Sequence, residues 1–264
     1  MPQAVVHFLV IERALKELYP SLWAEHYSFA ALGSFAPDMF YAQDGIIGKD
    51  PFFDSLANKM HETGALDCWG TGKSDRLAKW SRQWWSDAAE DAANLIKRLG
   101  YESARIIGCS GGAAIAILLA TQFPEKVLSI IADSEITDYE YDDMLKLSVE
   151  TRNIPDRAQL SFWKKAHGND WYEVIQKDND IMLDIAANGH VFKDKLEEIS
   201  CPILFCGSLK EEEYVPYFGE SMLDMLRQVE QAELYLINDG DHPLMWTCPE
   251  RFRGIALAFF QPDY

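Results

Sequence analysis

The sequence predicts an α/β protein with a mostly parallel central sheet and helices on both faces of that sheet. The first observation behind this prediction is a strand–helix–strand pattern. Residues 103–107 and 127–132 are short apolar runs, and residues 113–123 between them are apolar and rich in helix formers. Such a unit of about 30 residues implies parallel strands and a right-handed crossover. The second observation is that short apolar runs alternate with helical patterns along much of the remaining chain.

The chain ahead of this unit predicts a less regular start. Residues 5–25 are expected to form a helix because Ile11, Leu15, Leu18 and Leu22 recur at steps of three and four. The other expected elements in this part are a strand at 26–31, a loop at 32–38, a helix at 51–62, a strand at 65–68, a loop at 69–76 and an amphipathic helix at 80–99.

The pattern changes after the second strand of the unit. Residues 135–198 are rich in acidic and aromatic residues and contain three helix-like segments without strands, which predicts an inserted helical cap. Residues 1–134 and 199–264 are then the two parts of one core domain. In the second part we expect a strand at 202–207, a helix at 217–231, a strand at 233–237, a loop at 240–243 and a helix at 250–260.

Composition excludes several classes of partner. With 264 residues the chain can bury a sizeable core without a disulfide or a metal. The formal net charge of −18, from 24 basic and 42 acidic residues, argues against nucleic acid and against anionic membrane surfaces. The five cysteines are odd in number and show no C-x-x-C spacing, which favours a reducing compartment. The apolar run at residues 5–11 is too short to span a bilayer, so we expect a cytoplasmic protein.

The glycine-rich loop at residues 69–76 is not typical of a nucleotide site. Gly70 and Gly72 form G-x-G but not G-x-G-x-x-G, and only Gly72-Lys73-Ser74 matches the end of a P-loop. We therefore interpret this segment as a structural loop, and the sequence predicts no cofactor and no metal.

Ser110 is the candidate nucleophile. It is the central residue of Gly108-Cys109-Ser110-Gly111-Gly112, which matches G-x-S-x-G between an expected strand and an expected helix. In such a turn the serine takes a strained backbone conformation that exposes its oxygen, and the two outer glycines let strand and helix approach closely.

A serine hydroxyl needs a neighbouring base, and His242 is the candidate. It lies in the loop Gly240-Asp241-His242-Pro243, directly after the last expected strand, where it can reach the carboxyl edge of a parallel sheet. The five other histidines have no comparable setting.

The residues alone leave more than one candidate for the acid that orients the histidine. Glu211, Glu212 and Glu213 follow the strand at 202–207, and we choose Glu211 ahead of Glu212. Asp133, at the end of the strand after the nucleophile helix, is a third candidate because it also lies at the carboxyl edge.

These motifs together resemble the α/β-hydrolase superfamily, and within it the serine hydrolases that are similar to valacyclovir hydrolase-like esterases. Its characteristic segments match Asp67–Ser74 (D-x-x-G-x-G-x-S), residues 108–112, Pro124-Glu125-Lys126-Val127 and Gly240-Asp241-His242. The resemblance spans residues 67–242 and implies the α/β-hydrolase fold.

The resemblance also implies an oxyanion hole made of two backbone N–H groups. Gly111 supplies the first, and Ala31 or Leu32, near the end of the first core strand, supplies the second. The specificity of the family's amino-ester hydrolases does not carry over to this sequence, since Gly111 stands where those enzymes have an aspartate. The family also begins with an antiparallel strand pair, which residues 1–25 are expected to replace with a helix.

The sequence therefore predicts a serine hydrolase that cleaves a small carboxylic ester through an acyl-enzyme. The aromatic residues Phe162, Trp163, Trp171 and Tyr172 of the expected cap form either an apolar substrate pocket or the core of the cap itself. Two alternatives remain open: a non-catalytic ligand-binding or scaffold protein of the same fold, and a C–C hydrolase or perhydrolase that uses the same triad. The oligomeric state stays open as well.

Overall fold

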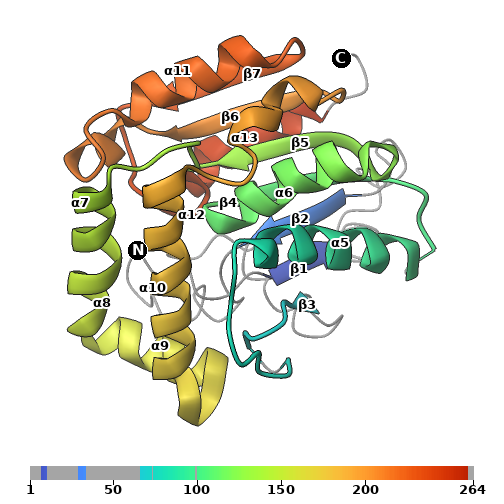
Figure 1. Ribbon diagram of the computed structural model, residues 1–264. Coiled ribbons are helices and arrows are strands. Elements are labelled where there is room, and N and C mark those ends of the chain that lie inside the picture. Colours follow the sequence, from blue (N-terminus) through green and yellow to red (C-terminus); the bar gives the residue numbers. More distant parts are fainter. Residues whose placement is uncertain (1–6, 11–28, 34–65, 73, 99, 261–264) are drawn as a thin grey trace.

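The computed structural model describes residues 7–10, 29–33, 66–72, 74–98 and 100–260 (Figure 1). Within these residues, one sheet has the strand order β3-β1-β2-β4-β5-β6-β7. The strands are β1 (His7–Val10), β2 (Phe29–Gly33), β3 (Leu66–Asp67), β4 (Ala104–Cys109), β5 (Val127–Asp133), β6 (Ile203–Ser208) and β7 (Ala232–Ile237).

The sheet is mostly parallel, as expected. The neighbouring strands β2, β4, β5, β6 and β7 all pair in parallel, and only β1 pairs antiparallel, with β2 and with β3. The register places Cys109 of β4 beside Asp133 of β5, and Asp133 beside Cys206 of β6. The carboxyl ends of these three strands therefore meet at one edge, where a parallel sheet offers its ligand sites.

The expectation of a helix over residues 5–25 is wrong at its start. His7–Val10 form strand β1, which pairs with β2 and β3. The physical reason is that Phe8, Leu9 and Val10 form a short continuous apolar run that periodicity cannot assign, and pairing with β2 on one side and β3 on the other makes it a strand. The helical spacing that misled the prediction begins at Ile11, and residues 11–25 lie outside the described residues, as does the expected helix at 51–62.

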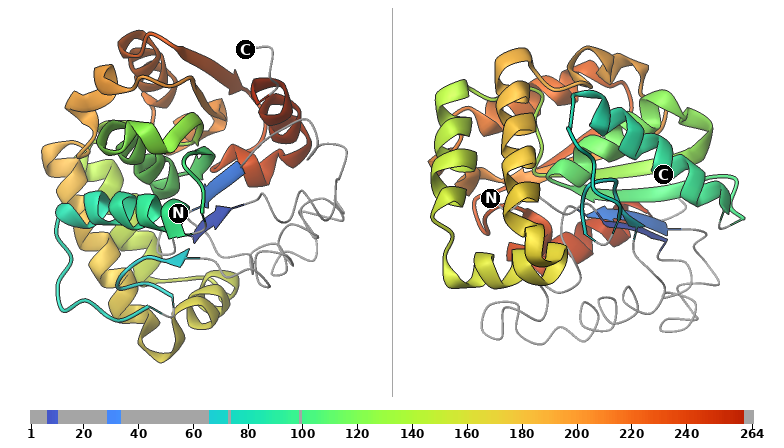
Figure 2. Two further views of the ribbon diagram at one scale, coloured as in Figure 1. Left: turned by 90° about the vertical axis from the view of Figure 1, so that its right-hand side faces the viewer. Right: turned by 60° about the horizontal axis from the view of Figure 1, so that its bottom comes forward.

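Helices cover both faces of the sheet (Figures 1 and 2). The side chains of Ile203 and Phe205 in β6 belong to the core that contains α5, α6 and α11, whereas Leu204 and Cys206 pack with α12 and α13 on the opposite face. This alternation is the two-residue period of a strand. These helices are α5 (Gln83–Arg98), α6 (Gly111–Gln122), α11 (Phe218–Gln228), α12 (Leu244–Thr247) and α13 (Pro249–Phe259).

Helix α6 is the most deeply buried of these elements. Every residue from Gly111 to Ala120 is buried, which explains why this helix is apolar on all sides rather than amphipathic. It lies against β4, β5 and α5, so its first residue is fixed at the carboxyl edge of the sheet.

Between β5 and β6 the described chain forms helices and no strand, and these helices lie together at one end of the sheet (Figure 1). Arg76 ties them to the core, because its guanidinium pairs with Asp170 (Nε to Oδ2, 2.6 Å) and donates to the carbonyl of His167 (2.7 Å). The elements are α7 (Tyr141–Met144), the π-helical turn η2 (Leu145–Glu150), α8 (Thr151–Asn153), α9 (Arg157–His167), α10 (Trp171–Asn188) and the short 3-10 segments η3 (Gly168–Asp170) and η4 (Lys193–Glu198).

Two further 3-10 segments complete the described elements, η1 (Pro124–Lys126) and η5 (Leu209–Glu213). Within the described ranges no helix combines the length and apolar character needed to cross a bilayer. The division into a core and a cap at residues 134/135 and 198/199 stays a prediction.

Candidate functional site

Ser110 lies in a sharp turn between β4 and α6. Its φ of 51° falls in the left-handed region that non-glycine residues rarely adopt. Gly108 makes this turn possible, because a Cβ there would lie 2.3 Å from the carbonyl oxygen of Gly112. Gly108 is thus required by a close approach of two backbones, as the sequence predicts.

His242 contacts Ser110 and Glu211 through its two ring nitrogens. Its Nε2 lies 3.0 Å from Ser110 Oγ, and its Nδ1 lies 2.7 Å from Glu211 Oε2. Ser110 comes from the turn after β4, Glu211 from η5 after β6, and His242 from the loop after β7. Three distant segments therefore bring a hydroxyl, an imidazole and a carboxylate into one line.

Of the three acids that the residues alone left open, Glu211 is the one that contacts His242 within the described structure. The neighbouring Glu212 turns toward α11, where its Oε1 accepts from the backbone N–H of Gly219 (3.3 Å). Asp133 has other partners: its Oδ2 accepts from the backbone N–H of Met245 at 2.8 Å.

The site is shielded from solvent. Ser110 has 0% of its surface exposed, and the side chains of His242 and Glu211 are 5% and 2% exposed. Burial of this kind lowers the local dielectric, so the hydrogen bonds along the Ser110–His242–Glu211 line are stronger than they would be in water.

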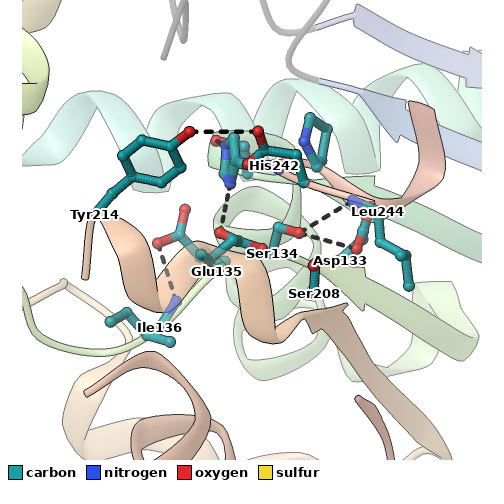
Figure 3. Close-up of polar contacts among 12 residues, drawn as sticks. Asp133, Ser134, Glu135, Ile136, Ser208, Tyr214, His242 and Leu244 are labelled. Carbon is teal, nitrogen blue, oxygen red and sulfur yellow. Dashed lines mark hydrogen bonds and ion pairs between the residues drawn. The ribbon is translucent and has the colours of Figure 1, made fainter. Parts of the chain in front are cut away.

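Two further buried carboxyl groups lie near His242. Burial raises the pKa of Asp133 to about 7, although the hydrogen bond from Met245 N–H opposes this shift. Burial likewise raises the pKa of Glu135 to about 7, opposed by the hydrogen bond from the Tyr139 hydroxyl (2.7 Å). Figure 3 shows Asp133, Ser134 and Glu135 around His242 and Leu244. Both groups carry a proton part of the time near neutral pH.

The expected oxyanion donors lie in two different elements. Gly111 is the first residue of α6, so its N–H has no partner inside that helix and lies at the positive end of the helix dipole. Ala31 and Leu32 lie inside β2, paired in register with Ile107 and Gly108 of β4. The strand continues to Gly33, two residues beyond its expected end, and the residue that follows it lies outside the described residues.

Trp85 of α5 is a neighbour of the site that the sequence analysis did not single out. Its Cη2 would lie 3.1 Å from a Cβ placed on Gly111, so the indole fills the space of the missing side chain. Trp85 also packs against His190 (ring centroids 5.1 Å apart), whose pKa is lowered to about 3 by burial. The tryptophan-rich start of α5 was the only sequence signal for this contact.

The aromatic residues expected in the cap contact one another. Trp163 is buried and stacks on Trp171 with ring centroids 5.7 Å apart, and Trp171 meets Tyr172 edge to face. This packing favours the view that Trp163 and Trp171 form part of a local core, whereas Tyr172 is 50% exposed. The side chain of Phe162 lies outside the described residues. No group of three or more His, Cys, Asp or Glu side chains in the described ranges is arranged to hold a metal ion.

Comparison with known proteins agrees with this fold. The model of a family described as the alpha/beta hydrolase fold matches residues 45–164. The structure has the α/β-hydrolase fold. It is 24% identical over 223 residues to Serine hydrolase BPHL of Mus musculus, covering 80% of this chain and 73% of that protein.

Two other comparisons also find named hydrolases. It is 23% identical over 235 residues to a 2-hydroxy-6-oxononadienedioate/2-hydroxy-6-oxononatrienedioate hydrolase of Burkholderia vietnamiensis, covering 79% of each protein. The solved structure of Est816, described as an N-acyl homoserine lactone degrading enzyme, superposes with a TM-score of 0.59 at 19% identity, covering 87% of this chain and 91% of that one. At 19% identity, this structural similarity shows a shared fold alone.

Proposed function

We propose that this protein is a serine hydrolase of the α/β-hydrolase family that cleaves a small carboxylic ester through an acyl-enzyme. The observation that carries the proposal is the pair of contacts made by His242, 3.0 Å to Ser110 Oγ and 2.7 Å to Glu211 Oε2. Both distances lie within the reach that proton transfer to a general base requires.

The proposed reaction has two halves. His242 Nε2 takes the proton of Ser110 as Oγ bonds to the ester carbonyl carbon, and the same nitrogen then gives that proton to the leaving alkoxide. In the second half His242 takes a proton from water as the water oxygen bonds to the acyl carbon. It then gives that proton to Ser110 Oγ as the bond between Oγ and the acyl carbon breaks, which releases the acid. Glu211 accepts the Nδ1–H bond, which fixes the ring orientation and stabilises the imidazolium in both halves.

The negative charge of the tetrahedral intermediate needs backbone donors. Gly111 N–H at the start of α6 is the proposed first donor, and Ala31 or Leu32 of β2 the proposed second. Because Ser110 has no exposed surface, we expect substrate entry to displace side chains that cover it. In this view residues 135–198 act as the cap, and Trp85 forms the pocket wall beside Gly111.

The proposal is tested by turnover of p-nitrophenyl acetate and butyrate. The Ser110→Ala variant should lose turnover while its circular dichroism spectrum stays that of the wild type. Ser129→Ala is the matched control, because Ser129 is a buried serine of β5 whose hydroxyl has no hydrogen-bond partner in the described structure. Equal turnover by wild type and Ser110→Ala would refute the proposal. If turnover depends on Ser110, a panel of acyl chain lengths will define the size of the pocket.

A second candidate reaction is hydrolysis of a C–C bond by the same three residues. The relative in Burkholderia vietnamiensis, named as a hydrolase of 2-hydroxy-6-oxo dienedioates, favours it. Loss of the absorbance of such a dienoate on addition of enzyme, faster than ester turnover, would favour C–C cleavage over esterase activity.

No disulfide joins any of the five cysteines within the described residues, which supports the proposal of a cytoplasmic location.

A further inference from the structure

The loop that carries His242 is attached to the end of β5 by two side chains. Asp133 Oδ2 accepts a hydrogen bond from the backbone N–H of Met245 at 2.8 Å. Ser134 Oγ accepts one from the backbone N–H of Leu244 at 3.3 Å. These two amides lie two and three residues after His242, and we call Asp133 and Ser134 the β5 clamp (Figure 3).

The β5 clamp is itself held rigidly. The Ser134 hydroxyl donates to Asp133 Oδ1 (3.1 Å), and Ser134 N–H donates to the carbonyl of Cys206 in β6 (2.8 Å). Ser134 also has a φ of 59°, a conformation that surrounding contacts must maintain. Both residues are completely buried, so water does not compete for these bonds.

The same aspartate also contacts the nucleophile turn. The backbone carbonyl of Asp133 accepts from the N–H of Ser110 at 2.8 Å, in the register that sets Asp133 beside Cys109. Its main chain thus holds Ser110 and its side chain holds the histidine loop. No hydrogen bond joins Asp133 to His242 within the described residues, so its contacts are those of a support rather than of a triad acid.

We propose that Asp133, with Ser134, is a positioning residue that sets the distance between Ser110 Oγ and His242 Nε2. This inference rests on the proposed function for its effect on turnover, but the geometry of the clamp does not depend on it. A buried carboxylate is costly to keep, and no Lys or Arg side chain bonds to this one within the described structure. Three accepted bonds compensate for that cost: from Met245 N–H, from the Ser134 hydroxyl and, at 3.5 Å, from the Cys206 thiol.

The test compares three substitutions with a control. Asp133→Ala removes the acceptor for Met245 N–H, and Asp133→Asn keeps an oxygen that can accept from it. Ser134→Ala removes the acceptor for Leu244 N–H, and Ser129→Ala removes a hydroxyl from the same strand that bonds neither to the loop nor to the clamp.

Two readouts separate positioning from simple loss of stability. The first is the split between kcat and KM for p-nitrophenyl butyrate, measured well below the melting temperature of each variant. The second is the far-downfield proton NMR signal of His242 Nδ1–H, which the short bond to Glu211 should produce in the resting enzyme without any substrate.

A displacement of about 1 Å at a reacting group lowers rates by about 10²-fold. Asp133→Ala should therefore lower kcat by about 10²-fold with little change in KM, and shift or remove the Nδ1–H signal. Asp133→Asn and Ser134→Ala should show smaller losses, and Ser129→Ala none. If Asp133→Ala does not fold, the test is whether Asp133→Asn and Ser134→Ala lower kcat more than the control Ser129→Ala does.

Unchanged kcat and an unchanged Nδ1–H signal in Asp133→Asn and Ser134→Ala, with Asp133→Ala folded and equally active, would overturn the positioning role. A wild-type protein that turns over no ester, but whose Nδ1–H signal is lost in Asp133→Ala, would refute the esterase proposal and support the clamp. The two failures are thus distinguishable.

Discussion

At the scale of single residues, the site depends on backbone strain that only small side chains allow. Ser110 at φ 51° is followed by a helix whose backbone passes so close that Gly108 admits no Cβ. This part of the site was predictable, because a G-x-S-x-G pattern between a strand and a helix specifies those glycines by steric exclusion alone.

Gly108→Ala should therefore destabilise the fold. Its Cβ would lie 2.3 Å from the Gly112 carbonyl oxygen, and the backbone must shift to relieve the clash. We expect a loss of about 1 to 3 kcal/mol in the free energy of unfolding, measured by urea denaturation. Gly254→Ala is the matched control, because Gly254 lies inside α13 with nothing within 4 Å of its Cβ position, and it should gain about 0.5 to 1 kcal/mol. Equal stability of Gly108→Ala and wild type would contradict the steric account.

Glu135 makes stability depend on pH. Its pKa in the folded protein is raised to about 7 from the model-compound value of 4.5, so its contribution to stability is complete below pH 4.5 and is lost as pH rises through about 7. The advantage of Glu135→Gln over wild type in unfolding free energy should therefore be larger at pH 8 than at pH 5, by at most about 1.4 kcal/mol per pH unit. A difference between Glu135→Gln and wild type that is the same at pH 5 and at pH 8 would contradict this prediction.

The choice among the acids shows where residue patterns stop being informative. Glu211 and Glu212 are adjacent in one 3-10 turn, and one faces His242 while the other bonds to the Gly219 N–H. Their order in the chain does not reveal which way each side chain points. The role of Asp133 was hidden for the same reason, since a strand-end aspartate can support a loop as readily as it can orient a histidine.

At the scale of elements, most strands and helices around the site follow from apolar periodicity, with ends that differ by a few residues. Strand β1 is the exception, because four residues are too few to separate a strand from a helix by periodicity, and the pairing with β2 and β3 decided the outcome. The contact of Trp85 with Gly111 joins α5 to α6 across 26 positions of sequence, and no local pattern encodes it.

A buried ion pair joins two of the helices between β5 and β6. Arg152 of α8 donates to Asp178 Oδ2 (2.6 Å) and to Asn179 Oδ1 (2.9 Å), both in α10. Arg152→Met would leave the Asp178 carboxylate buried without its cation, which should cost about 3 to 5 kcal/mol of unfolding free energy. The double variant Arg152→Met/Asp178→Leu should lose less than Arg152→Met alone. A double variant that is the less stable of the two would contradict this reading.

At the scale of the whole molecule, the fold brings together residues that are 132 positions apart, Ser110 and His242, at one edge of a parallel sheet. The chain also carries a net charge of −18, which opposes compaction through self-repulsion.

Salt should therefore stabilise this protein. Raising the ionic strength from about 0.01 M to about 0.15 M shortens the Debye length from about 30 Å to about 8 Å and screens that repulsion. The melting temperature, measured by differential scanning fluorimetry in sodium chloride, should rise over this range. A falling melting temperature would mean that local ion pairs such as Arg76–Asp170 outweigh the net charge.

The central claim is that the Ser110 hydroxyl is an activated nucleophile. Its most direct test is mass-spectrometric mapping of the covalent adduct formed when the folded protein reacts with a fluorophosphonate. The account predicts one phosphonyl group, on the peptide that contains Ser110. No adduct on that peptide, under conditions in which a known serine hydrolase is labelled completely, would contradict it.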